Sequence, residues 1–186
     1  MLIIADAGHG YSTPGKRTVD GMREYEFNRE VAHHLKIFLE KYQNTAVLFS
    51  HSDKRDVPLS ERTSLANSHH ADLFVSIHAN ASGDGKTWNG AGGIETFVHT
   101  SFPLKAFQLA QLLQKKLTAA TCRKSRGIKG ADFYVLKHTK MPAVLVECGF
   151  MTNKEEAGLL RTAAYQERCA WAIAEGIVER YGLLRR

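Results

Sequence analysis

The sequence predicts a three-layer α/β domain, in which helices cover both faces of a twisted, mixed but mostly parallel sheet of about six strands. Continuous apolar runs, such as residues 73–77 and 142–146, alternate along the chain with amphipathic stretches. A strand that is apolar on both sides is typical of a sheet buried between two layers of helices. The chain has 186 residues, 44% hydrophobic and 24% charged, which suits one domain and argues against disorder.

The expected elements follow, in order, from the spacing of the apolar residues. Short apolar runs predict strands at residues 2–5, 45–49, 73–77, 94–98, 133–136 and 142–146. Apolar residues three and four positions apart predict helices at residues 26–42, 59–69, 103–120 and 163–181. Pro58 stands just before the second helix, and a glycine-rich turn at 89–93 precedes the fourth strand. We therefore assign residues 1–182 to one domain and 183–186 to a tail or the start of a linker.

The cysteines and the amino-terminal residues indicate a reducing compartment. Residues 1–6 contain no basic region and reach an acid too early for a signal peptide, so we expect synthesis in the cytoplasm. The three cysteines form no CxxC pair, which excludes a cysteine-rich zinc module and favours buried thiols over disulfides.

The net charge of +6 fits an anionic polymer as partner, although a mildly basic surface also serves solubility alone. No helix-turn-helix or RNA-binding pattern is present, so we expect no nucleic acid partner. No run approaches the roughly 18 to 20 apolar residues of a membrane span, so we expect no membrane partner. An acidic bacterial wall is the other anionic polymer that this charge fits.

Polar side chains follow three of the apolar strands. One strand leads into His9, another into His78 and a third into Glu147, while Glu24 opens the first long helix. Ligands of α/β folds bind beyond the carboxyl ends of strands, so these side chains can converge. Two histidines and one carboxylate form a catalytic zinc set, and a second carboxylate then acts as general base. From spacing alone, each histidine remains open to a plain structural role and Glu147 to pairing with a base.

The ordered motifs resemble the N-acetylmuramoyl-L-alanine amidase type 3 family over nearly the whole chain. They are DAGHG at 6–10, Glu24 with Asn28, Arg62 with 66–67, ADLFVSIHAN at 71–80, RGI at 126–128, FYVL at 133–136 and MPAVLVECGFMTN at 141–153. The resemblance implies that His9, Glu24 and His78 bind one Zn²⁺ per chain and that Glu147 is the catalytic carboxylate. It also implies hydrolysis of the amide bond between N-acetylmuramic acid and L-alanine in bacterial peptidoglycan. Ala7 and Cys148 depart from the residues common at their positions in the family.

Helical geometry distinguishes Glu24 from its neighbour Glu26. Residues two apart on a helix point about 200° from each other, so only one of the two can face a metal. The spacing to Asn28 favours Glu24. The paired histidines at 33–34 and 69–70 lie on expected helices, where we expect no metal.

Substrate contacts are expected at Asn80, Arg126 and Lys129. The segment 123–129 holds four basic residues in seven and is expected to be a solvated loop, which in a wall hydrolase would steer anionic glycan or stem-peptide carboxylates. Cys148 is an alternative nucleophile, but a small buried thiol is the favoured interpretation.

Two rival functions remain open at this point. One is another zinc amide hydrolase, such as a carboxypeptidase or deacetylase; the other is a non-catalytic module that binds wall polymer. The favoured interpretation is a monomeric wall hydrolase, either a phage endolysin or a bacterial autolysin, that acts on the wall after release from the cytoplasm.

Overall fold

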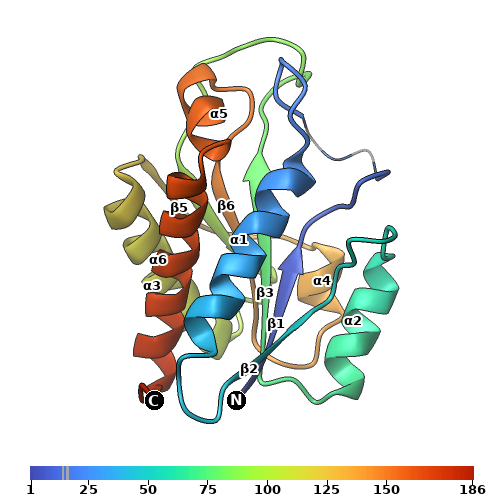
Figure 1. Ribbon diagram of the computed structural model, residues 1–186, viewed down its shortest axis with the longest axis vertical. Coiled ribbons are helices and arrows are strands. Elements are labelled where there is room, and N and C mark those ends of the chain that lie inside the picture. The colour runs from blue at the N-terminus through green and yellow to red at the C-terminus, as the bar shows by residue number, and fades with distance from the viewer. Residues whose placement is uncertain (14, 16) are drawn as a thin grey trace.

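A six-stranded sheet forms the centre of the computed structural model, which describes residues 1–13, 15 and 17–186 (Figure 1). Its strands are β1 Leu2–Ala7, β2 Ala46–Phe49, β3 Leu73–Asn80, β4 Ile94–Val98, β5 Ser125–Gly130 and β6 Ala143–Phe150. The spatial order is β2-β1-β3-β6-β4-β5. The first four strands of that order run parallel, β4 runs antiparallel to β6, and β5 runs parallel to β4. The expected mixed, mostly parallel sheet is confirmed.

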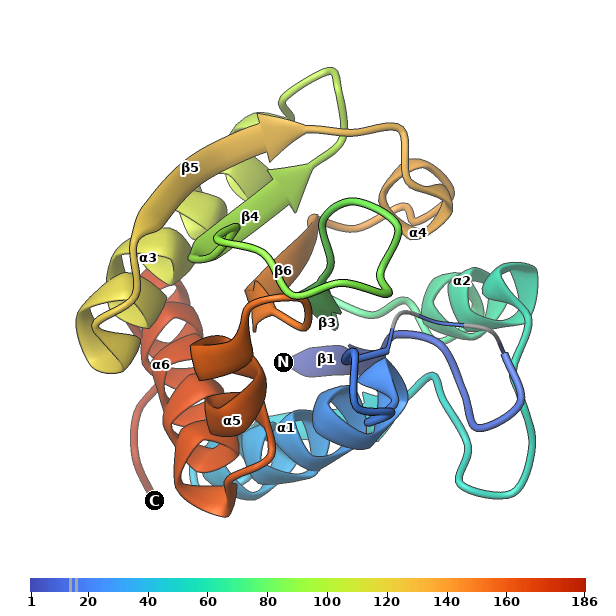
Figure 2. The same ribbon diagram turned by 90° about the horizontal axis from the view of Figure 1, so that it is seen from above.

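Helices cover both faces of this sheet, as expected (Figure 2). They are α1 Glu24–Leu39, α2 Leu59–Ser68, α3 Leu104–Thr121, α4 Tyr134–Lys137, α5 Lys154–Leu160 and α6 Ala163–Tyr181. The larger core lies between the sheet and α1, α3 and α6, and a smaller core lies under α2 and α4. Among the residues described, no helix is both long and apolar enough to cross a membrane.

The alternation of side chains along β3 decides on which side of the sheet the polar residues emerge. Leu73, Val75 and Ile77 point into the larger core. Because successive residues of a strand face opposite ways, Ser76 and His78 point to the side of α2 and α4. That side carries the smaller core, so the polar residues at the carboxyl ends of the strands face a space that the helices leave open.

The expected strand at 133–136 is wrong, because the segment forms the short helix α4 with Phe133 at its amino-terminal cap. A run of four apolar residues does not distinguish a strand from a buried helical turn. Val135 and Leu136 pack into the smaller core, whereas Phe133 and Tyr134 are exposed. This apolar run therefore forms a short helix that packs against β6, and it adds no strand to the sheet.

The expected solvated loop at 123–129 is also wrong, because residues 125–130 form the edge strand β5. Its charged and glycine residues give no apolar alternation by which a strand can be recognised. The strand is held by its ladder to β4 and by the packing of Ile128 against the larger core. Helix α5 was likewise not predicted, although Asn153 caps its amino terminus by accepting from the amide of Glu156.

The cysteines and the carboxyl terminus give one further correction and one unforeseen contact. All three cysteines are free; Cys148 and Cys169 are buried, but Cys122 is exposed, so the expectation of buried thiols is wrong for Cys122.

Helix α6 ends at Gly182 in the left-handed conformation. The residues after it return to the loop that follows α1, where the amides of Gln43 and Arg186 donate to Leu184 and Lys41.

Candidate active site

His9, Glu24 and His78 come together at the carboxyl end of the sheet. Glu24, at the first turn of α1, is 2% exposed. Its Oε1 lies 2.8 Å from His78 Nδ1, and its Oε2 lies 3.1 Å from His9 Nε2. The two imidazole rings stand edge to face with centroids 5.2 Å apart. The carboxylate therefore lies between two histidines that are far apart in the sequence.

The hydrogen bonds around Ser76 determine which nitrogen of His78 carries the proton. The Ser76 hydroxyl donates to Asp6 Oδ2 at 2.6 Å, so its oxygen accepts from His78 Nε2, 3.1 Å away. The ring proton therefore resides on Nε2, and the lone pair of Nδ1 faces the Glu24 carboxylate. A nitrogen lone pair and a carboxylate repel at this separation, so the position between them suits a proton or a metal cation.

The donor set fits zinc. Burial alone would raise the pKa of Glu24, but the close contacts of its carboxylate with His78 and His9 lower it below the ordinary value. The hydrogen bond to Glu24 raises the pKa of His9. One ligand atom from each of the three residues lies within 4.8 Å of the others. Two imidazole nitrogens and one carboxylate oxygen are a ligand set that zinc uses in catalytic sites, with a fourth position left open.

A second group, formed by His33, His51 and Asp53, also brings three donors within 4.8 Å, but its chemistry does not suit a metal. Both oxygens of Asp53 accept from Arg29, at 2.6 and 3.0 Å, so a cation already occupies this carboxylate. His51 Nδ1 accepts from the amide of Ala7 at 3.3 Å, which leaves the proton of the neutral ring on Nε2. This group anchors the end of β1.

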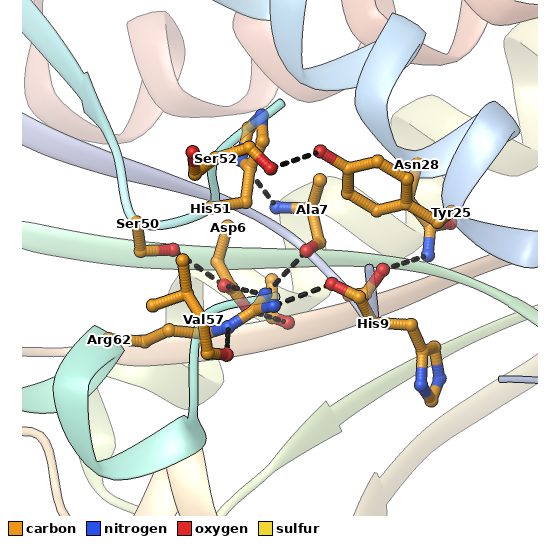
Figure 3. Close-up of polar contacts among 12 residues, drawn as sticks. Asp6, Ala7, His9, Tyr25, Asn28, Ser50, His51, Ser52, Val57 and Arg62 are labelled. Atoms are coloured by element: carbon orange, nitrogen blue, oxygen red, sulfur yellow. Dashed lines mark hydrogen bonds and ion pairs between the residues drawn. The ribbon is translucent and has the colours of Figure 1, made fainter. Parts of the chain in front are cut away.

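Buried Arg62 of α2 holds the backbone around His9 (Figure 3). Its Nη1 pairs with Asp6 Oδ1 at 2.8 Å and donates to the carbonyl of Ala7. Its Nη2 donates to the carbonyl of His9, and its Nε donates to that of Val57 at 2.9 Å. One guanidinium thus joins the end of β1 to the loop that carries His9. Sequence reasoning placed Arg62 in a motif but assigned it no role.

Asp6 is the buried anion that balances Arg62. It accepts hydrogen bonds from Ser50 and Ser76, both at 2.6 Å, as well as from Arg62. Burial would raise the pKa of Asp6, but the Arg62 charge and these hydrogen bonds lower it. Asp6 therefore stays ionised and fixes both Arg62 and, through Ser76, the orientation of His78.

Helix α1 presents Glu24 and Glu26 in different directions. Glu24 is buried beside the two histidines, whereas Glu26 is exposed. The amide of Asn28, one turn along the helix, donates to Glu24 Oε1 at 3.3 Å and to the carbonyl of Gly8 at 3.1 Å. Asn28 therefore supports both the glutamate and the loop that leads to His9.

Glu147 lies beside His78 in the sheet, since the two residues are register partners of β6 and β3. Its Oε2 is buried and, among the described residues, has no hydrogen-bond partner. Burial, together with the nearby Glu24 and Glu95 carboxylates, raises the pKa of Glu147 well above its ordinary value. A raised pKa makes the Glu147 carboxylate a stronger base, which suits it to accept a proton.

The basic residues near Glu147 pair with a different carboxylate. Arg126 Nε and Lys129 Nζ both donate to Glu95, which is 3% exposed and is the register partner of Glu147 on β4. Across the described part of the chain, Glu147 takes part in none of the ion pairs. The alternative in which Glu147 neutralises a base therefore has no support in the geometry.

Cys148 is placed away from the site. It lies in the larger core, on the face of β6 opposite to Glu147, with a side chain that is fully buried. A hydrogen bond with Cys169, together with burial, raises the pKa of its thiol well above the ordinary value. A buried and protonated thiol does not act as a nucleophile, which rules out Cys148 in that role.

A cleft of about 970 Å³ opens beside these residues. His9, Glu24, His78, Asn80 and Glu147 line it, and Phe133, Tyr134 and Leu145 supply part of its apolar wall. Arg126 and Lys129 do not line this cleft; they lie on the neighbouring edge of the sheet, bound to Glu95. The structure therefore brings together five of the seven expected site residues and places the other two beside them.

Sequence reasoning missed Ser76 and Glu95, and it linked Gly8 to a sharp turn beside His9 but not to the packing of His78. A Cβ on Gly8 would lie 2.1 Å from His78 Cε1, so only glycine allows the ring to occupy its place. Ser76 and Glu95 are polar residues inside apolar strand patterns, and this is the signal that marks both in the sequence.

Comparison with known proteins identifies the family. The family model described as N-acetylmuramoyl-L-alanine amidase matches residues 3–179. The chain is 39% identical over 180 residues to N-acetylmuramoyl-L-alanine amidase LytC of Bacillus subtilis, covering 96% of this chain but only 35% of LytC, so it spans about a third of that relative's length. It is 33% identical over 185 residues to the endolysin of Bacillus phage SPP1, covering 100% of this chain and 68% of the endolysin.

Solved structures agree with this relationship. The crystal structure of the N-acetylmuramoyl-L-alanine amidase from Clostridium difficile 630 matches with a TM-score of 0.90 and 33% identity, covering 96% of this chain and 95% of the other. The chain therefore belongs to the N-acetylmuramoyl-L-alanine amidase family.

Proposed function

We propose that the chain hydrolyses the amide bond between N-acetylmuramic acid and L-alanine in bacterial peptidoglycan, with one zinc ion held by His9, Glu24 and His78. The enzyme class follows from the family match over residues 3–179. The observation that carries the metal is the orientation of His78, whose Nδ1 lone pair faces the Glu24 carboxylate at 2.8 Å. That arrangement is stable with a bound cation and unfavourable without a positive charge.

The residues around this position divide the chemistry between them. A zinc ion held there would polarise the carbonyl of the scissile amide and acidify a water molecule. Glu147, with its raised pKa, takes the proton of the attacking water and delivers it to the nitrogen of the departing L-alanine. Without that proton the amine is a poor leaving group, so one carboxyl group serves as base and then as acid. Asp6, Ser76 and Arg62 keep the two histidines in place throughout.

The cleft supports a polymeric substrate bound from the solvent side. Asn80 lies at its wall, with a side-chain oxygen that accepts from the amide of Ala81 at 2.7 Å, so its NH₂ group is oriented by this bond. We assign Asn80, Arg126 and Lys129 to substrate contacts. All of the proposed zinc ligands and the general base come from one chain, which supports a monomer that acts on the bacterial wall.

Digestion of purified muropeptides separates this function from its rivals. The zinc-loaded protein should release stem peptides with a new L-alanine amino terminus, identified by mass spectrometry. A carboxypeptidase would instead release carboxyl-terminal residues, and a deacetylase would leave the stem attached. Chelation should abolish the reaction and zinc should restore it. Turnover by a protein shown to be free of metal would contradict the proposed role of zinc, and binding without cleavage would favour a non-catalytic module.

A further inference from the structure

A second charged cluster lies next to the site, on β4 and β5. Glu95 is 3% exposed, and each of its two oxygens accepts from a different cation: Oε1 from Arg126 Nε and Oε2 from Lys129 Nζ at 2.9 Å. The Arg126 guanidinium lies 4.8 Å from the ring centroid of Phe150, and Lys129 Nζ lies 5.9 Å from that of Phe97. Both cations are therefore held by a buried anion and an aromatic ring.

An irregularity in β5 places the two cations on the same face of the sheet. In a regular strand, residues three positions apart point to opposite faces. The β4–β5 register shifts between Ile94 and Thr96, and Gly127 takes a left-handed φ of 82°. Such a bulge inserts one extra residue, so Arg126 and Lys129 both face the side that carries Glu147. The bulge is thus the feature that assembles the cluster.

The cluster has the charge and the free donors to bind an anion. Two positive side chains face one carboxylate, so a single positive charge is left over. Arg126 Nη2 and two of the three protons on Lys129 Nζ have no acceptor within the described part of the chain. Arg126 is 33% exposed at its side chain and Lys129 42%, so a ligand can reach both. An arginine beside a lysine is a donor arrangement that suits a carboxylate.

The position of the cluster matches a peptide that extends from the scissile bond. Glu95 is the register partner of Glu147, and β5 is the next strand beyond β4. Two strand spacings put the backbone of β5, which carries Arg126 and Lys129, about 10 Å from that of β6, which carries Glu147. An extended peptide covers about 10 Å in roughly three residues.

We propose that Arg126 and Lys129, positioned by Glu95, form a subsite for a carboxylate within the first residues of the stem peptide. The inference rests on the proposed function, because the amidase reaction places the stem peptide at Glu147. It identifies the substrate class as stem peptides that carry a free carboxylate near the cleaved bond, and it predicts discrimination against the amidated forms of the same peptides.

The test compares two soluble muropeptides that differ only in whether the stem-peptide carboxylates are free or amidated. The zinc-loaded protein should show a kcat/KM for the free acid higher by roughly tenfold or more, mostly through KM. Lys129→Met and Arg126→Gln should each remove most of that preference, mainly by raising KM for the free acid. Lys129→Glu should invert the preference, because the new carboxylate repels the free acid. Equal preference ratios in the parent protein and in these variants would overturn the subsite.

The control is Lys116→Met. Lys116 of α3 also pairs with a glutamate, Glu179 of α6, but this pair joins two helices and does not involve β4 or β5. This variant should keep the preference of the parent protein. Melting curves establish that each variant is folded.

A binding measurement tests the subsite without turnover. The dissociation constants of both muropeptides are measured on a Glu147→Gln background. Equal constants would overturn the subsite, whereas failure of the parent protein to cleave either substrate would instead contradict the proposed function.

Discussion

Arg62 Nη2 donates to the carbonyl oxygen of His9, the residue proposed as a zinc ligand. His9 adopts a left-handed φ of 64°, which is uncommon for a residue with a side chain. The same guanidinium is held by the buried Asp6 carboxylate, so a buried ion pair at the end of the sheet supports the unusual backbone of His9.

Replacement of Arg62 by lysine should weaken zinc binding. Arg62→Lys keeps the positive charge beside Asp6 but loses the second guanidinium nitrogen, Nη2, which donates to the His9 carbonyl. Loss of such a supporting contact typically lowers metal affinity by about 10- to 100-fold. Competition with a chromophoric chelator measures the affinity, and Arg55→Lys, which alters an exposed pair with Glu61, is the matched control. An affinity equal to that of the parent protein would show that His9 needs no such support.

A methyl group at Gly8 should displace His78. The Cβ of Gly8→Ala would lie 2.1 Å from Cε1 of the ring, so the ring must move. Zinc affinity and turnover should both fall, because the Nδ1 lone pair no longer faces Glu24. Gly158→Ala, in α5 with nothing near its added Cβ, should leave both values unchanged. Normal zinc affinity in Gly8→Ala would contradict the assignment of His78.

The two glutamates of the first turn of α1 offer a matched pair of variants. Glu24→Gln should lower the bound zinc below one per chain, because it removes the anionic ligand between the two histidines. Glu26→Gln should retain one zinc, since Glu26 is exposed. Elemental analysis after dialysis gives the stoichiometry. The ligand assignment is wrong if the Glu26 variant loses metal and the Glu24 variant does not.

Removal of the Glu147 carboxylate should separate metal binding from turnover. Glu147→Gln keeps the three proposed ligands, so the variant should hold about one zinc per chain. It loses proton transfer and should turn over more slowly by roughly two to four orders of magnitude. Metal content and activity must be measured on the same sample. Loss of zinc would make Glu147 a ligand, and near-normal turnover would exclude it from the reaction.

The stability of the metal-free protein should decline on acidification because of His51. Burial, aided by the Arg62 charge, lowers the pKa of His51 from 6.5 to about 4. Between these values the unfolded chain binds a proton that the folded protein does not, so stability falls as the pH drops through this window. The expected loss is at most about 3 kcal/mol. Urea unfolding gives the free energy of unfolding at pH 4.5 and at pH 7. The difference between these two values should be smaller for His51→Gln than for the parent protein.

The sheet and its site differ in how far the sequence predicts them. The long helices and the buried strands follow from periodicity, and helical phase separates Glu24 from Glu26. The edge strand β5 is not predicted, because its residues show no alternation of apolar and polar side chains. The contact of Arg126 with Glu95 is not predicted either, because the two residues lie 31 positions apart in the sequence. The contacts of Arg62 join α2 to the end of β1, 53 to 56 residues away, and no local pattern encodes such a distance.

The bulge at Gly127 also bears on how the molecule behaves at high concentration. β5 is the last strand in the order of the sheet, and a regular edge strand there would offer a template for the sheet of another copy. Lysine, arginine and a bulge are devices by which proteins keep such edges from pairing. The side chains proposed to select the substrate thus also protect the chain from aggregation. A variant that accepts neutral substrates by losing these charges would become more prone to self-association along the same edge.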